Sequence, residues 1–152
     1  MKTIIKPIIF MSVTIFIVTV AYAQFAKPEE AIRYRKSLMF LILKHFKPMG
    51  AVVQGKVTYE KGTFTENADH VNNLAALPLA ASLAPGSDKG DTTLKSVALD
   101  NPDKFKKEAE SFEAATARLA STSRGGGMDA IKAQFGMVAK SCKSCHQQFR
   151  TK

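Results

Sequence analysis

The chain contains one C-x-x-C-H pattern, close to its carboxyl end, made by Cys142, Cys145 and His146. This is the pattern that attaches a c-type haem. The two thiols add to the vinyl groups of the porphyrin as thioethers, and the histidine offers its imidazole to the iron. Residues three and four apart share one face of a helix, so a helical segment would point all three side chains the same way. The sequence predicts one covalent haem c on Cys142 and Cys145, with His146 as an axial iron ligand.

Three other chemistries use paired cysteines. Half of a zinc site would need two more ligands, and the remaining histidines, His45 and His70, stand at no familiar zinc spacing. A thiol–disulfide oxidoreductase motif belongs at the start of a helix after a strand, and no strand is expected here. A disulfide across two intervening residues closes too small a loop to stabilise much. Both cysteines of the chain fall in the motif, so haem attachment is the favoured interpretation.

The first residues have the layout of a secretory signal peptide. Lys2 and Lys6 precede an apolar run over 8–20, and Ala21-Tyr22-Ala23 supplies a small-x-small cleavage signal. We expect residues 1–23 to be removed, leaving one domain over 24–152. A retained membrane anchor is the alternative, but the apolar run is short for a membrane span.

Export limits the partners of this basic chain. Cleavage would shorten the 152 residues to 129 and, by removing Lys2 and Lys6, lower the formal net charge from +9 to +7. A chain of this length builds a single core. A basic surface can meet nucleic acid, an anionic membrane or an acidic redox partner. We expect no nucleic acid partner for an exported protein and no membrane contact after cleavage. The lysines are scattered, which is typical of a solvated surface that steers acidic partners.

Helical apolar spacing appears first in two stretches of the expected domain. One covers 31–49 and is closed by Pro48 and Gly50. The next starts just after Thr63, the first residue of a capping box, and runs into the low eighties. Pro78 should bend this second helix or mark its last turns.

Two more helices follow a long connection over 84–100. A connection of this length in a small domain either borders a ligand or is a surface loop without a ligand, and the sequence does not favour one over the other. The third begins after Asn101, an expected N-cap, and is broken over Ser121–Gly127. The fourth starts near Met128 and carries the haem motif on its apolar stripe. Four amphipathic helices without a convincing strand predict an all-α fold, an antiparallel four-helix bundle.

An attachment motif at the carboxyl end of such a chain resembles the cytochrome c prime family, the class II c-type cytochromes. The resemblance covers the whole expected domain and is closest in Gln24-Phe25-Ala26-Lys27-Pro28-Glu29, Tyr34-Arg35-Lys36-Ser37, Leu77-Pro78 and the haem motif with Phe149-Arg150. It implies a haem attached outside the cytoplasmic membrane of a bacterium, and therefore a periplasmic protein. It also implies homodimers that pair through the first two helices.

The resemblance assigns roles to further residues. Arg35 matches an arginine beside the haem propionates, and Lys36 follows it where relatives often have glutamine. Asp91 and Thr93 fall in a loop where relatives place further propionate contacts. Arg150 matches a basic residue on the proximal side of the haem.

The resemblance places Met39 against the distal haem face, where relatives commonly carry an apolar blocker. Methionine can also coordinate haem iron, so two functions follow. If Met39 only packs, with Ile42 and Leu79 excluding water, the haem is five-coordinate and high-spin and binds nitric oxide or carbon monoxide, with electron transfer secondary. If its sulfur ligates the iron opposite His146, the haem is low-spin and the protein is a dedicated electron carrier. A methionine at helical spacing is more often core than ligand, which favours the first function.

A haem enzyme such as a peroxidase would need a distal base. His45 lies six residues after Met39, about 240° round a helix, and so points away from the distal face. His70 is expected on the flank of the second helix. We therefore expect a non-enzymatic protein whose partners are small gases, unidentified redox proteins and a second copy of itself.

Overall fold

The computed structural model describes residues 25–152. The expected signal peptide and its cleavage point lie outside the described residues. Among the helices that are described, none has the length and apolar character to cross a membrane.

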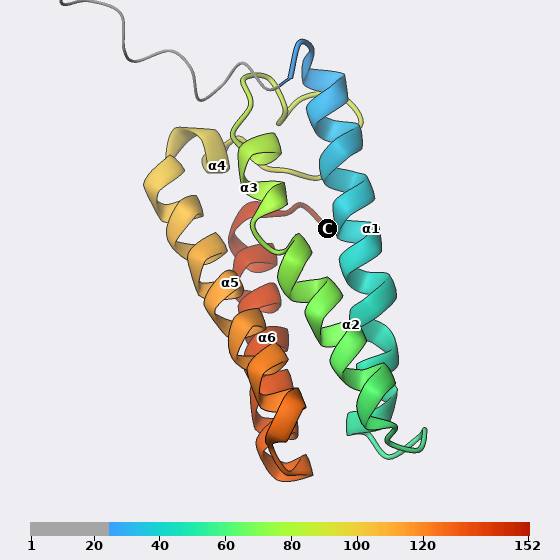
Figure 1. Ribbon diagram of the computed structural model, residues 1–152. Coiled ribbons are helices and arrows are strands. Elements are labelled where there is room, and N and C mark those ends of the chain that lie inside the picture. The colour runs from blue at the N-terminus through green and yellow to red at the C-terminus, as the bar shows by residue number, and fades with distance from the viewer. Residues whose placement is uncertain (1–24) are drawn as a thin grey trace, which may run out of the picture.

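Four long helices run along a common axis in alternating directions (Figure 1). Two short helices lie in the connection between the second and third of them. The helices are α1 (Pro28–Val53), α2 (Lys61–Leu74), α3 (Leu77–Ser82), α4 (Val97–Asp100), α5 (Pro102–Gly125) and α6 (Met128–Phe149). The described residues contain no β-strand, only an isolated antiparallel bridge between Leu94 and Arg150. The expected all-α, antiparallel four-helix bundle is confirmed.

The first helix continues past Pro48, so the expected end near Met49 is wrong. Proline removes one helical hydrogen bond, but tertiary packing compensates because Met49 is only 1 % exposed and Gly50 is buried. The helix ends instead before Gly55, which adopts a φ of 70°. Its N–H donates to Val52 O at 2.9 Å, a closing turn that favours glycine.

The second expected helix is divided in two. α2 begins at Lys61 with Glu60 as its N-cap, so the capping box at Thr63 does not form. The chain then breaks after Leu74 and restarts as α3, with Pro78 buried in its first turn. Pro78 has no N–H to donate to the carbonyl of Leu74, four residues earlier, which favours the end of α2 at that residue.

The third expected helix is longer than its sequence indicates. α5 continues through Ser121 to Gly125 because its polar residues bond within the bundle. Ser123 Oγ donates to Ala120 O at 2.8 Å, and Thr65 Oγ1 of α2 donates to Ser123 O at 3.1 Å. The connection over 84–100 also contains one helical turn, α4, at its end.

The apolar interior is divided into two main clusters that meet at the haem motif. The larger cluster joins α1, α2, α5 and α6 and includes Met49, Leu119 and Val138, with Cys142 packed against it. The second cluster is centred on Phe105 and Phe149, with Cys145 packed against it. The two thiols therefore lie at the boundary between the two clusters, where the core is not continuous.

Candidate haem-binding site

The motif residues lie near the end of α6 on one side of the helix. Cys142 and Cys145 are half-buried and are not joined to each other, and His146 is exposed. Phe149, one turn further, is 2 % exposed and anchors the helix by an edge contact with Phe105, whose ring centroid is 5.0 Å away. Packing of α6 on α5 thus presents two thiols and an imidazole together, as the C-x-x-C-H spacing predicts.

The surroundings favour neutral forms of these three groups. Burial raises the pKa of Cys145 to about 11, with smaller contributions from Glu108 and Cys142. Burial also raises the pKa of the Cys142 thiol. For His146, partial desolvation by the neighbouring residues and the positive charge of Arg150 lower the pKa. The imidazole is therefore held in the neutral form that can ligate a metal.

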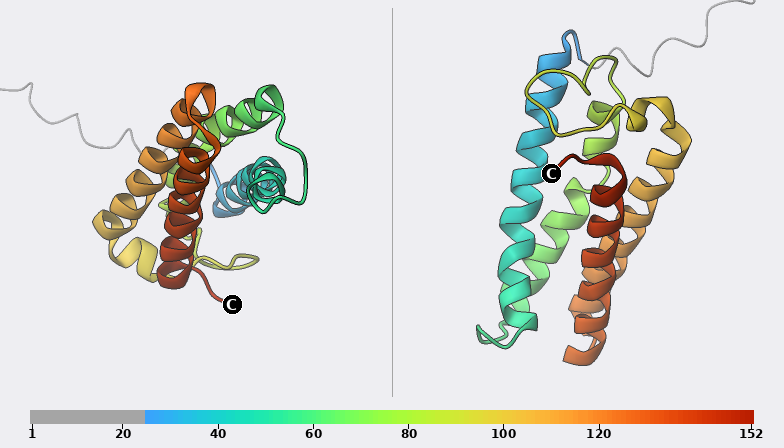
Figure 2. Two further views of the ribbon diagram at one scale, coloured as in Figure 1. Left: turned by 90° about the horizontal axis from the view of Figure 1, so that it is seen from below. Right: turned by 180° about the vertical axis from the view of Figure 1, so that it is seen from behind.

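The opposite wall is supplied by α1. Phe46 of α1 stacks on Phe135 of α6 with ring centroids 4.3 Å apart and planes within 5°. Met39 lies seven residues before Phe46, and Cys142 lies seven residues after Phe135. Because the two helices are antiparallel (Figure 2, right), Met39 and Cys142 are both about two turns beyond the stacked rings in the same direction. Met39 is 41 % exposed, so its thioether borders open space at the level of the motif.

Arg35, one turn before Met39, is buried and bonded to the connection that follows α2. Its guanidinium donates to Ala81 O at 3.1 Å, to Ser87 O at 2.8 Å and to Thr92 Oγ1 at 2.6 Å. Burial lowers the pKa of Arg35, and the nearby Asp88 carboxylate opposes this shift. The side chain thereby fixes the loop to α1; a propionate contact stays a prediction.

The same loop reaches the other wall of the site. Thr151 N donates to Thr93 O at 2.8 Å, and Lys95 N donates to Phe149 O at 2.9 Å. These bonds, with the Leu94 bridge, hold Arg150 in extended backbone just after α6 ends. The loop segment 92–95 thus joins α1 to the end of the motif helix.

The remaining predicted loop contact is an ion pair. Lys36 Nζ lies 2.7 Å from Asp91 Oδ2, and both side chains are exposed. Arg35, Lys36, Asp91 and Thr93 therefore lie around one loop, and their contact with haem propionates stays a prediction. Thr92 lies within the loop range 91–93 that the resemblance indicated, but its bond to Arg35 was not predicted, and Lys95 was missed because a lysine in a loop carries no pattern that marks such a contact.

The two other histidines lie on a different flank of α1. His45 and His70 pack with ring centroids 4.4 Å apart, and His45 Nδ1 is 3.0 Å from Asn67 Oδ1 of α2. Within the described chain, no three histidine, cysteine or acidic side chains are grouped to hold a metal ion. This pair belongs to the α1–α2 contact, away from the face that Met39 occupies.

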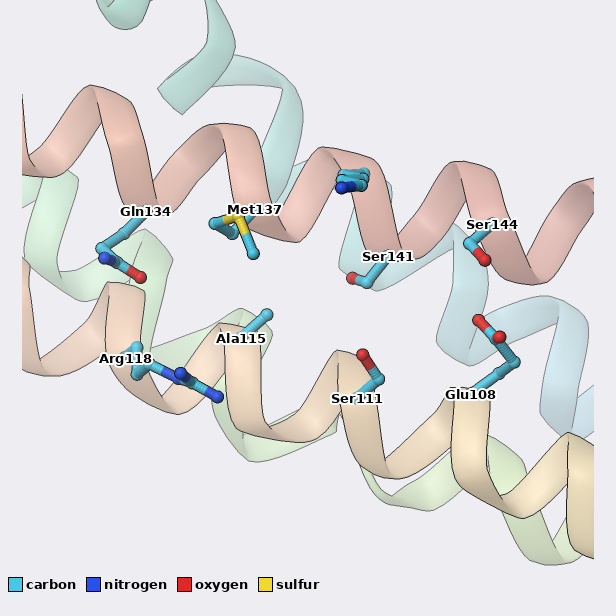
Figure 3. A pocket seen from close by; sticks show the side chains of 9 residues that line it. Glu108, Ser111, Ala115, Arg118, Gln134, Met137, Ser141 and Ser144 are labelled. Atoms are coloured by element: carbon cyan, nitrogen blue, oxygen red, sulfur yellow. The ribbon is translucent and has the colours of Figure 1, made fainter.

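A groove of about 500 Å³ between α5 and α6 has a different lining (Figure 3). Serines at 111, 141 and 144 line it together with Glu108, Arg118 and Lys140. Ala115 and Met137 also line the groove, which lies on the α5 side of α6 rather than on the side of Met39.

The family described as Cytochrome C' matches residues 30–150, which include both walls of the site. The chain belongs to the cytochrome c prime family. It is 36 % identical over 129 residues to a cytochrome c' of Alcaligenes xylosoxydans xylosoxydans, covering 85 % of this chain and 99 % of that protein.

Solved structures of cytochrome c prime proteins have the same bundle. Cytochrome c prime from Shewanella frigidimarina aligns with a TM-score of 0.82 at 32 % identity, covering 85 % of this chain and all of that one. A nitric oxide complex of a variant from Alcaligenes xylosoxidans aligns at 0.78 and 35 % identity, covering 85 % and 99 %.

Proteins of the cytochrome c prime family bind haem c, and the cofactor of this chain is therefore haem c. The described residues fit it. Two thiols lie at the boundary of two apolar clusters, a neutral imidazole follows them, and the apolar Met39 faces the same level from α1.

Proposed function

We propose that this protein is an exported, periplasmic cytochrome c prime that binds nitric oxide or carbon monoxide at a five-coordinate haem iron, with electron transfer as a secondary role. The observation that carries the proposal is the placement of the C-x-x-C-H side chains on α6 across from Met39 on α1. A nitric oxide complex of a similar protein supports the gas-binding part.

The motif residues hold the cofactor in two ways, through covalent bonds to the porphyrin and through a bond to the iron. Cys142 and Cys145 form the two thioethers, which fix the porphyrin to α6. His146 would supply an imidazole nitrogen to the haem iron, and its lowered pKa favours the neutral imidazole that can bind a metal. When bound, the haem iron supplies an open coordination position and a one-electron redox couple.

Residues of α1 and α3 control the distal face. Met39, Ile42 and Leu79 present apolar surface that disfavours water and charged ligands but admits small neutral gases. Met39 acts here as a packing residue, because a flexible thioether fills irregular space well.

Basic and hydroxyl groups around the connection between α3 and α4 hold the haem propionates. Arg35 and Lys36 provide positive charge there, and Asp91 and Thr93 position the loop around it. Arg150 stands beside the proximal face, close enough to His146 to lower the imidazole pKa. A cation in that position can stabilise a polar ligand on the His146 side of the iron.

A second copy of the chain completes the proposed assembly. Leu41 of α1 is 41 % exposed. Burial of this side chain against a symmetry-related α1–α2 face would stabilise a homodimer. Light scattering of the exported protein measures this directly, and a monomer at micromolar concentration would contradict it.

The visible spectra of the ferric and ferrous protein test the proposed haem state. We expect high-spin spectra in both states and a marked change when carbon monoxide or nitric oxide is added. The exposed thioether of Met39 favours one second candidate, a low-spin electron carrier with His146 and Met39 as axial ligands. A sharp, split ferrous spectrum with a sulfur–iron band in the near infrared would establish that candidate instead.

A further inference from the structure

One face of the bundle is formed by α1 and α6 side by side (Figure 2, right). The Phe46–Phe135 stack marks the contact between the helices beneath this face. His45 and its partner Asn67 mark the α2 side of α1, and the pair Gln148 and Glu108 marks the α5 side of α6. The flank of α1 away from α2 and the flank of α6 away from α5 therefore lie next to each other. Together they form a solvent-facing surface on the side of the bundle that carries His146.

Exposed cations surround this face. Steps of three and four residues on α6 place Lys132 and Lys143 on the flank toward α1, and Lys47 occupies the matching flank of α1. All three are exposed, and none lies within ion-pair distance of a carboxylate in the described residues. Lys36 and Arg150 extend the ring toward the loop end. Two acids lie at the loop end of this face: Asp91, which is paired with Lys36, and Glu29, which lines the same surface groove as Lys36.

The middle of this ring of cations is apolar. Leu43 is 59 % exposed and Phe40 is 65 % exposed on α1. Across from them, α6 presents Gly136 and Ala139, which carry no side chain beyond a methyl group. An apolar centre within a charged rim is the layout of a protein docking surface, in which the charges set orientation and encounter rate.

We propose that the α1–α6 face, rimmed by Lys47, Lys132 and Lys143 around Leu43, docks an acidic protein that exchanges electrons with this cytochrome. The inference rests on the electron-transfer role proposed above and names the class of its partner. Lys143 stands between the two motif cysteines, so a partner on this face is held next to the haem attachment. A second copy of the chain is a poor occupant because it would bring like charges together. Two apolar side chains are also too few to insert into a lipid surface.

Charged inorganic redox complexes can replace the unknown partner protein in a test of the α1–α6 face. The variant Lys47→Gln/Lys132→Gln/Lys143→Gln removes three rim charges from the haem-loaded protein. The control Lys61→Gln/Lys104→Gln/Lys107→Gln removes three exposed charges from other surfaces.

Oxidation of the ferrous protein by anionic hexacyanoferrate(III) should slow about fivefold in the rim variant at low ionic strength and less than about twofold in the control. Oxidation by cationic tris(phenanthroline)cobalt(III) should not slow in either variant. Equal slowing of hexacyanoferrate(III) oxidation in the two variants would overturn the proposal.

A binding map separates this proposal from the electron-transfer role itself. Paramagnetic hexacyanochromate(III) should broaden amide signals around the rim lysines of the isotope-labelled holoprotein, and the rim variant should lose this broadening. Broadening spread over the whole basic surface would overturn the docking face, even if electron transfer is fast. Localised broadening with no oxidation by either complex would leave the anion-binding face intact and contradict the electron-transfer role. Binding of the native chain, but not of the rim variant, to phosphatidylglycerol vesicles at physiological salt would assign the face to a membrane instead.

Discussion

Arg35 donates a hydrogen bond of 2.6 Å to Thr92 Oγ1, which links α1 to the loop that also holds the end of α6. Two residues after Thr92 in that loop, Leu94 forms the bridge to Arg150. One short segment thus connects α1, which carries Met39, with the end of the motif helix α6. The two sides of the haem site are fixed relative to each other through this loop.

Replacing Arg35 tests how much this connection stabilises the fold. Arg35→Leu removes three hydrogen bonds from a side chain that is 7 % exposed. We expect the free energy of unfolding to fall by about 2–4 kcal/mol, because buried bonds to a charged donor are lost. Denaturant unfolding measures the change. Arg33→Leu, an exposed arginine two residues earlier, is the matched control and should cost less than about 0.5 kcal/mol. Equal losses in the two variants would contradict the loop-fixing role.

Arg150 should influence ligands rather than stability. Its side chain is exposed and makes no hydrogen bond or ion pair within the described residues. We expect Arg150→Gln to change the free energy of unfolding by less than about 0.5 kcal/mol. The dissociation rate of nitric oxide from the ferrous protein should rise several-fold, because a charged donor beside the proximal face is removed. Lys152→Gln removes the same charge two residues later and serves as the control. An unchanged dissociation rate in Arg150→Gln would argue against a proximal role.

Local sequence patterns predicted the helices of this fold. The helix ends that the patterns predicted wrongly depend on long-range contacts. The apolar stripe of α6 and the spacing of Cys142 and His146 are local features, so both were predictable. The continuation of α1 through Pro48 depends on burial of Met49 and Gly50 against other helices. A proline signal contains no information about such packing.

The partners of Arg35 illustrate the same limit within the site. They lie 46 to 57 residues away in sequence, so their positions depend on the path of the whole connection. The resemblance could mark Arg35 as a site residue, but only the folded loop identifies Thr92 as its acceptor. The hydrogen bonds of Lys95 to the carbonyl of Phe149 and to neighbouring carbonyls could not be predicted from the sequence for the same reason.

The His45–His70 pair should contribute nothing to peroxide chemistry. The pair packs between α1 and α2, so neither imidazole is placed to accept a proton on the distal face. We expect peroxide turnover by the native protein to stay near that of a haem peptide, and His45→Gln to leave it unchanged. A peroxidase assay with a guaiacol-type donor measures both. Substantial turnover that His45→Gln abolishes would contradict the non-enzymatic function.

The thiols should react slowly in the folded chain before haem attachment. With its pKa raised to about 11, Cys145 holds only about one thiolate in a thousand at pH 8. Alkylation of the haem-free protein should therefore accelerate about tenfold per pH unit toward pH 11. Because the folded pKa exceeds the unfolded value, this group contributes stability that is present below the ordinary thiol pKa and lost as pH rises through about 11. Fast alkylation of native haem-free protein at pH 8, matching that in denaturant, would contradict the burial of Cys145.

Met39 should act on the access of ligands to the iron. Met39→Ala removes the side chain that faces the motif from α1, whereas Met39→Leu keeps its apolar volume. If Met39 only packs, both variants keep the high-spin spectrum. Carbon monoxide association should then quicken by about tenfold or more in Met39→Ala and change little in Met39→Leu, because the barrier on the distal side is steric. Flash photolysis measures both rates. Conversion of a low-spin native spectrum to high spin by both substitutions would instead make the sulfur of Met39 the sixth ligand, since leucine fills the space but cannot coordinate iron.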